Sequence, residues 1–449
     1  MSDGPELHAL ATRAVPASRQ ICVRPRIAGE CSPRRRAPEA AVRSGQRTCG
    51  RVSRRAGAGS SGGFTSARGL RYGVRVRRLV LLALVAVAPG SARAEDRFTA
   101  HVETYVDSDD TEVVRPSVSG AIGVTDELEV AGSYTVDVIT TASIDVITNA
   151  TAPAFSDRRD EAGLSATYRP LTGTEVGAGA TWSDESDYRS LALALRGSQE
   201  LLERNLTVSA RAGLVMDEVT SVADARFADS LTGYGYAAGV QQILSPTLLI
   251  HGGYEGAYLS GYQQSPYRFV RFGDFEFDMV DGAPVFDGVT ESRLERHPRR
   301  RLRHSLVAGA AWAMTRRTAL QPRAQIYSDD WGVRAGELEL LAFLEASERL
   351  TLRGRARAYL QSGADFYRER YLDVPDDLEH YTADKRLGPL HAYLAGIRAE
   401  YAVEGGPDSP FQRIGLDGKV EVVFNRYLEN VFLDTRTALI AQLGMLAEF

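Results

Sequence analysis

The sequence predicts an all-β chain, a transmembrane antiparallel up-and-down β-barrel of about 16 strands with short turns at one end and long loops at the other. Three observations support this fold class. Segments of about ten residues alternate between apolar and polar side chains, the connections alternate between short and long, and the last segment is apolar and ends at Phe449. About ten residues is the length that a tilted strand needs to cross a bilayer, whereas strands of soluble domains usually have five or six.

The chain divides by charge near residue 95. Of its 53 basic and 58 acidic residues, 18 Arg and four acids lie in residues 1–94, which leaves 35 basic and 54 acidic residues for the remainder. Two parts that differ so much in charge do not belong to a single globular domain. The strongly negative part, 95–449, is a poor candidate for binding nucleic acid. It also lacks cysteine, which excludes a disulfide framework or a thiolate site there.

A secretory signal peptide is predicted at residues 74–94. A basic stretch that ends at Arg78 precedes an uncharged apolar run, Leu79–Ala88, and the small residues Ala92 and Ala94 suit a cleavage site. The apolar run is too short to span a bilayer as a helix, and the alternative interpretation is a buried core helix. We therefore expect export, cleavage near Ala94 and a location in the bacterial outer membrane.

Residues 1–73 lie upstream of this signal, where a secretory signal is not expected. They are rich in Arg, Gly, Ser and Ala and show no periodicity. One interpretation is that they are upstream DNA read as protein, with the true start at Val74 or Val76. The other is a genuine basic, disordered extension. A native peptide from residues 1–70 in mass spectrometry would rule out the first interpretation.

The segment 95–449 has a hydrophobic period of two, which predicts strands with one apolar and one polar face. In one of them, Leu206, Val208 and Leu214 share a face, and Arg211 and Asp217 share the other. The strands are expected, in chain order, at 97–106, 113–124, 128–138, 160–169, 174–183, 187–197, 205–216, 233–244, 247–258, 303–314, 318–328, 333–346, 349–360, 389–402, 413–426 and 435–449.

The connections between these strands are short and long in turn. Residues 125–127 and 347–348 are short turns, whereas residues 139–159, 259–302 and 361–388 are long loops. Short turns at one end and long loops at the other are typical of an outer-membrane barrel. Because both termini then lie at the short-turn end, the number of strands must be even, and 14 or 18 strands also fit the pattern.

The last strand places Leu439, Leu443, Met445 and Phe449 on one face. A terminal Phe on an apolar face resembles the signal that the barrel-assembly machinery recognises. Pairing this strand with the first one removes both free edges, as a barrel in lipid requires. The expected partners are therefore outer-membrane lipids, lipopolysaccharide and the assembly machinery.

The candidate lumen residues are Arg353, Arg355 and Arg357, which alternate with apolar residues and so share one face of their strand. An arginine on the lipid face costs about 2–4 kcal/mol at mid-depth, so we expect all three in the lumen. The neighbouring strand brings Glu339 and Glu345 to the same face. Such a ladder either selects anions in a pore or pairs with the acids and braces the wall, and both interpretations stay open.

The predicted loops hold two further features. Residues 259–302 form a loop long enough either to fold into the lumen and narrow it or to lie outside as a surface flap. Acidic tips occur at 107–110, 184–187, 329–330 and 376–377. Clustered carboxylates can hold Ca²⁺ or Mg²⁺ at lipopolysaccharide phosphates, but these tips lack the spacing of a dedicated calcium loop. We expect solvated loop tips, with no metal and no cofactor.

Several short motifs in 97–449 resemble a family of proteobacterial outer-membrane barrels described only as a domain of unknown function (family 3570). The resemblance implies a barrel in the outer membrane and brings no catalytic residues. Members are similar in genomic context to proteins encoded near periplasmic flavin and redox genes, which suggests periplasmic redox partners. The motifs are Ile139–Val146, Ser183–Tyr188, Tyr327–Gly332, Tyr359–Tyr367 and Asp384–Leu387.

The sequence favours a porin-like passive channel for small solutes. One alternative is a closed barrel that anchors a periplasmic redox complex or a surface complex in the outer membrane. The other is an outer-membrane lipid-modifying enzyme, which we do not expect, since the six His after residue 95 lack metal-ligand spacing and no Gly-x-Ser-x-Gly occurs after residue 95.

Overall fold

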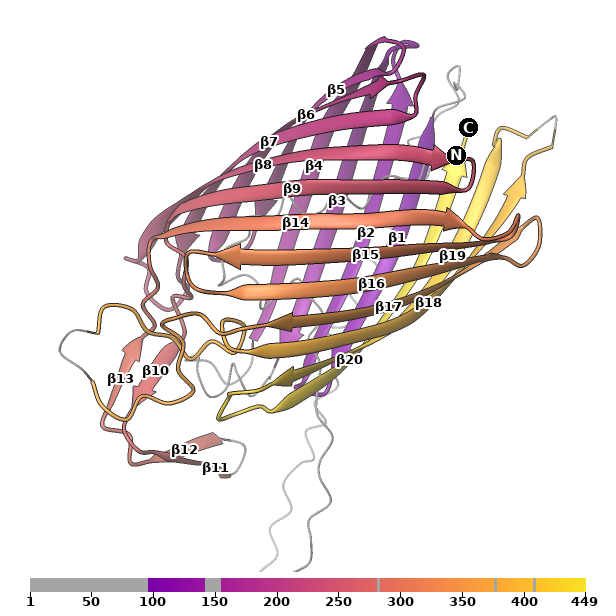
Figure 1. Ribbon diagram of the computed structural model, residues 1–449. Helices are drawn as coiled ribbons and strands as arrows, with labels where there is room; N and C mark the ends of the chain where they lie inside the picture. Colours follow the sequence, from indigo (N-terminus) through magenta and orange to yellow (C-terminus); the bar gives the residue numbers. More distant parts are fainter. Residues whose placement is uncertain (1–95, 142–154, 281–282, 375–377, 407–408) are drawn as a thin grey trace, which may run out of the picture. The chain divides into compact units, whose positions relative to one another are not determined.

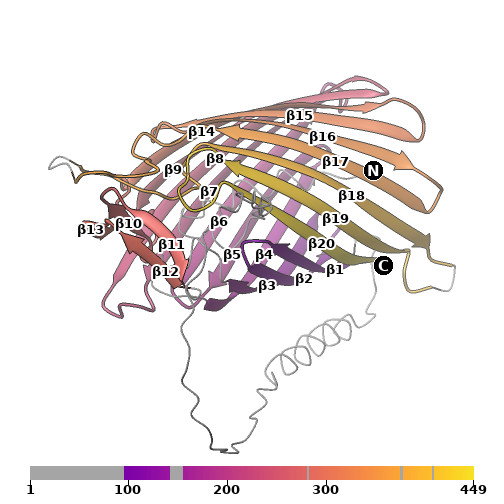
Figure 2. The same ribbon diagram turned by 90° about the horizontal axis from the view of Figure 1, so that it is seen from below.

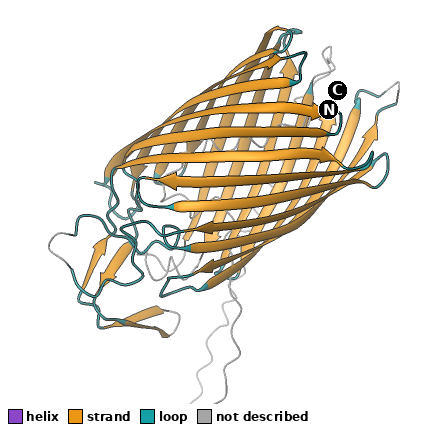
Figure 3. Cartoon of the chain, viewed as in Figure 1, coloured by secondary structure: helices purple, strands orange, loops and turns teal. Residues whose placement is uncertain are grey.

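The computed structural model describes residues 96–141, 155–280, 283–374, 378–406 and 409–449. These residues form strands joined by turns and loops (Figure 3). No helix among them is long and apolar enough to cross a membrane. The Ile139–Val146 motif falls largely outside the described residues, as do the predicted signal peptide, residues 1–73 and the acidic tip at 376–377.

Sixteen strands pair with their neighbours in chain order and close into an antiparallel barrel (Figure 1). The closure is made by β1 and β20, whose register pairs Val102 with Leu443. The barrel strands are β1 (Arg97–Asp107), β2 (Thr111–Gly123), β3 (Leu128–Thr141), β4 (Phe155–Leu171), β5 (Thr174–Asp184), β6 (Tyr188–Leu201), β7 (Leu206–Thr220), β8 (Ala228–Ser245), β9 (Leu248–Gly261), β14 (Arg300–Ala313), β15 (Thr318–Asp329), β16 (Arg334–Glu345), β17 (Leu350–Gln361), β18 (Leu390–Glu404), β19 (Arg413–Tyr427) and β20 (Thr435–Glu448).

The predicted fold class and the predicted number of 16 strands are confirmed. The predicted strands differ most from the structure at β4 and β8, which begin earlier than expected, at Phe155 and Ala228. Alternating hydrophobicity reports only the part of a strand that faces lipid. Backbone pairing continues into the polar ends of these strands, where residues such as Asp157 and Asp229 interrupt the pattern.

The two faces of the barrel wall differ as the sequence predicts. On the outer face, Leu338, Ile397 and Leu443 are 66, 72 and 73% exposed. An apolar band of this kind is unfavourable in water and matches the hydrocarbon of a bilayer. Trp182 and Trp312 are also exposed on this face, where aromatic rings favour the membrane interface.

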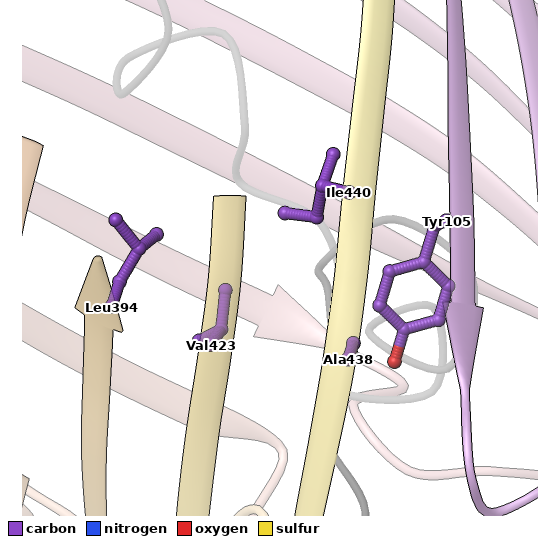
Figure 4. Close-up of a cluster of buried hydrophobic side chains, with 5 residues drawn as sticks. All are labelled: Tyr105, Leu394, Val423, Ala438 and Ile440. Carbon is purple, nitrogen blue, oxygen red and sulfur yellow. The ribbon is translucent and has the colours of Figure 1, made fainter. Parts of the chain in front are cut away.

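The inner face includes a small apolar cluster beside the β1–β20 seam (Figure 4). It joins side chains from four adjacent strands, β18, β19, β20 and β1, and all of them are buried. The cluster therefore packs apolar side chains across the seam, in addition to the backbone hydrogen bonds that close the sheet. Its members are Tyr105, Leu394, Val423, Ala438 and Ile440.

The loop between β9 and β14 folds into two small hairpins. Strand β10 (Phe269–Phe272) pairs with β13 (Glu291–Leu294), and β11 (Glu276–Val280) pairs with β12 (Ala283–Asp287). Figures 1 and 2 show these hairpins beyond the long-loop end of the barrel, away from the end where β20 finishes. The structure thus supports the surface-flap alternative for this loop.

Candidate functional site

The predicted lumen arginines lie on the inner face of β17. Their neighbours Leu352 and Leu360 are 39 and 46% exposed on the outer face. In the register with β16, Arg357 stands opposite Glu339 and Arg353 stands opposite Phe343. The alternation of β17 therefore orients the three guanidinium groups towards the inside of the barrel.

Two of these arginines form ion pairs along the inner wall. Arg355 contacts Glu339 on β16 with an N–O distance of 2.9 Å and Glu421 on β19 with one of 3.3 Å. Arg357 lies 3.5 Å from a carboxylate oxygen of Glu337. The Arg355 and Arg357 side chains keep 23 and 28% of their surface exposed. The arrangement has the geometry of a brace and leaves guanidinium surface open to the lumen.

The remaining two predicted residues take no part in these pairs. Glu345 is exposed near the short turn after β16, and among the described residues it has no cation within 4.0 Å. Arg353 likewise has no carboxylate partner in the described part of the wall. The wall network instead continues along β18 and β19, where the Arg398 guanidinium lies 3.3 Å from Asp417, and across the seam, where the Lys419 ammonium lies 2.9 Å from Glu103.

A second cluster of charges lies at the long-loop end of the barrel and was not predicted. We call it the rim cluster. It joins the loop between β9 and β14 to the loop between β17 and β18, and all of its side chains are almost completely buried. Its members are Arg268, Glu295, His297, Thr382, Asp384, Lys385 and Arg386.

Asp384 is the centre of the rim cluster. Its carboxylate accepts hydrogen bonds from the Arg386 guanidinium at 2.6 and 2.8 Å and pairs with Arg268. The Asp384 and Arg268 side chains are only 1 and 4% exposed. Charged groups so far from water need such complete pairing, because desolvation of each ion costs several kcal/mol. Arg268 and Asp384 come from different loops, so the pair fastens one loop to the other.

Glu295 makes a parallel connection between the same two loops. It accepts hydrogen bonds from the Ser265 amide and the Thr382 hydroxyl, both at 2.8 Å, and lies 3.3 Å from His297. Burial by itself raises the pKa of a carboxyl group, but His297 and Arg268 outweigh it and lower the pKa of Glu295. Glu295 is therefore held as a buried carboxylate anion.

Lys385 extends the rim cluster to the loop between β1 and β2. Its ammonium lies 3.6 Å from the carboxylate of Asp109, which also pairs with Arg436. Arg436 reaches Asp107 at 3.5 Å. The expectation of a solvated acidic tip at 107–110 is therefore wrong for Asp107 and Asp109, which are 6 and 7% exposed. The sequence could not show that cations more than 270 residues away neutralise them.

The predicted acidic tip at 329–330 also contains a buried aspartate, beside an exposed one. Asp329 is buried, and its carboxylate lies 2.5 Å from the Arg301 guanidinium. It also accepts hydrogen bonds from the amides of Trp331 and Val333, which shapes the turn between β15 and β16. Asp330 is exposed, as predicted. Asp329 therefore has a structural role that a solvated tip would not have.

One group of carboxylates in the described residues has a spacing that suits a metal ion. An oxygen from each of Asp157, Glu185 and Asp187 lies within 4.8 Å of the others. All three have protein partners already, and Asp157 accepts a hydrogen bond from the Arg158 amide at 2.8 Å. The Arg159 guanidinium lies 3.7 Å from Glu185, and the Tyr267 hydroxyl donates to Asp187 at 2.5 Å. These contacts give the group a structural role in joining loops.

The geometry of the histidines bears on the enzyme alternative. His297 contacts the carbonyl of Gln263 at 3.0 Å, and His304 contacts the Tyr254 hydroxyl at 2.6 Å. Within the described residues, no histidine nitrogen forms a hydrogen bond with a serine hydroxyl. The chemistry that the described residues do support is binding and electrostatic, in the wall and at the rim.

Comparison with known proteins gives a family and a set of distant barrels. A family model described as "Protein of unknown function (DUF3570)" matches residues 145–412, which is more than half of the chain. The chain belongs to the DUF3570 family. The resemblance carried by the sequence motifs is thereby confirmed, and four of the five motifs lie mainly or wholly within the matched range. No curated protein matches the sequence.

Among solved structures, this DUF3570 chain is similar to a bacterial polysaccharide outer membrane secretin, with 10% identity, coverage of 80% of this chain and 100% of the other, and a TM-score of 0.43. The toluene transporter TodX of Pseudomonas putida has 12% identity, with 82 and 93% covered and a TM-score of 0.37. The siderophore receptor PirA of Acinetobacter baumannii has 9% identity, with 75 and 54% covered and a TM-score of 0.39. The DUF3570 chain thus spans about half the length of that receptor.

The rim cluster of this DUF3570 chain does have a sequence signal, although an ambiguous one. Asp384–Leu387 carries three successive charges in a loop, and Glu295 and His297 precede a run of arginines. In a loop such charges are usually solvated. Their burial depends on two long loops meeting, which no local pattern records.

Proposed function

We propose that this barrel is a porin-like passive channel of the outer membrane for small polar solutes. The observation that carries the proposal is the solvent exposure of the charged side chains on the inner wall. Arg323, Arg355, Arg357 and Arg398 keep between 23 and 28% of their side-chain surface exposed although they face the inside of a closed barrel. Ions in a dry interior are strongly destabilised, so this exposure supports a hydrated lumen.

The size of the barrel agrees with this proposal. Barrels of 16 to 18 strands generally leave an aqueous channel, whereas barrels of about eight strands are filled by their own side chains. The apolar outer face supports a location in the outer membrane, in contact with its lipids. Because the wall charges are mostly paired, we expect weak selectivity between anions and cations and no binding of a specific ion in the wall.

The test is ion conductance in planar bilayers, with protein purified in detergent from the outer membrane of an expressing bacterium. We expect discrete steps of current. A KCl gradient gives the anion-to-cation preference, and Arg355→Gln should move the reversal potential towards cation preference by removing a positive charge from the lumen. Arg317→Gln is the matched control, because Arg317 lies exposed in the short turn between β14 and β15.

The second candidate is a closed barrel that anchors a periplasmic or surface complex. The loop contacts at the rim favour it, because they tie several loops together over one end of the barrel. Absence of current steps from a folded, heat-modifiable barrel would reject the channel and favour the anchor. If the wild type conducts but neither Arg355→Gln nor Arg317→Gln shifts the reversal potential, the wall charges do not set the ion preference.

A further inference from the structure

The structure contains a cavity of about 400 Å³ at the long-loop end, separate from the charged wall. It lies between the turn after β15 and the loop between β17 and β18. Two sequence motifs that the channel does not explain meet here, Tyr327–Gly332 and Tyr359–Tyr367. The volume falls within the range of roughly 300–1,000 Å³ that small-molecule sites occupy.

The two motifs are locked to each other by specific contacts. The amide of Asp365 donates to the carbonyl of Trp331 at 2.8 Å, and the Trp331 indole donates to the carbonyl of Arg300 at 2.8 Å. Gly332 has a φ of +84°, which strains any residue with a side chain, and a Cβ added there would meet the Asp365 carboxylate. The cavity wall is therefore preformed by backbone and buried rings.

The lining combines aromatic rings with charges of both signs. Phe366 packs against Trp331 and His380 with ring centroids 5.2 and 6.3 Å apart. Asp330 and Asp365 add exposed carboxylates, and no cation among the described residues lies within 4.0 Å of either one. Tyr371 and Arg368 complete the polar part of the lining.

These groups discriminate between ligand classes. A simple anion would be repelled by two carboxylates, and a simple cation would be opposed by the Arg368 guanidinium. A neutral molecule with several hydroxyl groups suits both, because each hydroxyl donates to a carboxylate or accepts from a guanidinium. The rings offer apolar surface to the C–H face of such a molecule.

We propose that this cavity is a binding site for a neutral saccharide, lined by Asp330, Asp365, Phe366, Arg368, Tyr371 and His380. The site lies at the mouth of the barrel on the long-loop side, where it would meet external sugars. It goes beyond the channel function and does not depend on conductance, since a closed barrel would bind the saccharide equally well.

Trp331 provides the optical probe for the test. The other tryptophans, Trp182 and Trp312, lie on the outer face of the barrel, so Trp182→Phe with Trp312→Phe leaves one reporter in the cavity wall. The folded protein in detergent is titrated with glucose, galactose, mannose, N-acetylglucosamine, maltose and lactose. Tetramethylammonium and phosphate serve as charged comparison ligands.

We expect saturable fluorescence changes with at least one saccharide and none with the two ions. Asp365→Ala and Phe366→Ala should each weaken that binding at least tenfold. Asp229→Ala, which removes a half-buried carboxylate outside the cavity, should leave it unchanged. Because a variant can lose the cavity by misfolding, each must first show the heat-modifiability of the parent and a Trp331 emission typical of a buried indole.

Three results would overturn the proposal. The first is the absence of saturation with every saccharide up to 50 mM in the folded parent protein. The second is equal binding in the parent and in folded Asp365→Ala and Phe366→Ala. The third is tighter binding of tetramethylammonium or phosphate than of any saccharide, which would assign the cavity to an ion.

Discussion

The inner wall and the rim cluster are built from the same residue types and differ in their access to water. Arg355 and Arg357 in the wall are 23 and 28% exposed, whereas Arg268 and Arg386 at the rim are 4 and 6% exposed. Exposed pairs contribute at most about 1 kcal/mol each, because water screens them. Loss of one partner from a buried pair costs about 3–5 kcal/mol, because the other charge stays buried alone.

The difference reflects what holds each region together. Along the wall, a continuous ladder of backbone hydrogen bonds joins every strand to its neighbours, so the charges add little to the shape. At the rim, the described residues of the two long loops share only isolated backbone bridges, Phe272 with Tyr371 and Arg296 with Tyr381. Side-chain ion pairs therefore carry much of the loop packing, and four measurements test this contrast.

The largest expected effect follows from Asp384→Ala. The change leaves the Arg268 and Arg386 guanidinium groups buried beside each other, and we expect the loop packing to lose about 3–5 kcal/mol. Hydrogen exchange should show lost protection in 268–272 and 381–387 while the barrel strands keep theirs. The matched control is Asp229→Ala, whose partner Arg299 is 61% exposed, with an expected change of at most about 1 kcal/mol. Similar losses in both variants would contradict the contrast.

A smaller effect is expected from pH acting on Glu295. The folded state lowers the pKa of this carboxyl below the ordinary 4.5, so its contribution is fully present above about pH 4.5 and is lost as pH falls below that value. Exchange rates of the two loops, corrected for intrinsic pH dependence, should rise from pH 5 to pH 3. Glu295→Gln should have weaker loops at neutral pH and lack this pH-dependent step. A step of unchanged size in the variant would assign it to another group.

A glycine-to-alanine substitution should lower the free energy of unfolding by about 1–3 kcal/mol at the rim and should change it little in the wall. Gly332→Ala places a side chain at a φ of +84° and against the Asp365 carboxylate, which strains the turn before β16. Gly336→Ala is the control, because a Cβ there meets nothing within 4 Å. Thermal unfolding followed by Trp331 emission compares the two. Equal stability of the two variants would show that the turn relaxes freely.

The smallest effect on stability is expected for Arg357→Gln in the wall. Its partner Glu337 keeps Arg323 at 3.2 Å, so no carboxylate is left alone, and the change should be at most about 1 kcal/mol. The temperature at which the barrel loses its heat-modifiable form should stay within a few degrees of the parent. A loss of stability as large as that of Asp384→Ala would show that the wall charges are as shielded from water as those at the rim.

The fold was largely predictable because its determinants are local. Alternation along each strand, as in Leu206, Val208 and Leu214, is a direct consequence of one side facing lipid and the other facing the lumen. Short turns such as 347–348 fix which strands are neighbours. The inner position of Arg353, Arg355 and Arg357 follows from the same alternation, because the lipid face excludes charge.

The partners of those arginines were only partly predictable. Glu339 comes from the adjacent strand and was expected, whereas Glu421 lies two strands away and reaches Arg355 across β18. Glu345 shares the face of Glu339 but sits at the short turn, beyond the reach of the ladder. The side of the wall on which a side chain lies follows from the alternation within its own strand. Its ion-pair partner also depends on the register between strands and on how inward side chains converge in a curved wall.

The sequence by itself determined the strands, their number, their two faces and the end of the barrel at which the long loops lie, because each of these depends on spacing along the chain. The tertiary structure alone decided that the β9–β14 loop leaves the barrel as a flap, that Asp384 and Glu295 become buried anions and that Lys385 reaches Asp109. These contacts join residues separated by 87 to 276 positions. Loops lack a period that would fix their path, so their meeting is decided by packing in three dimensions.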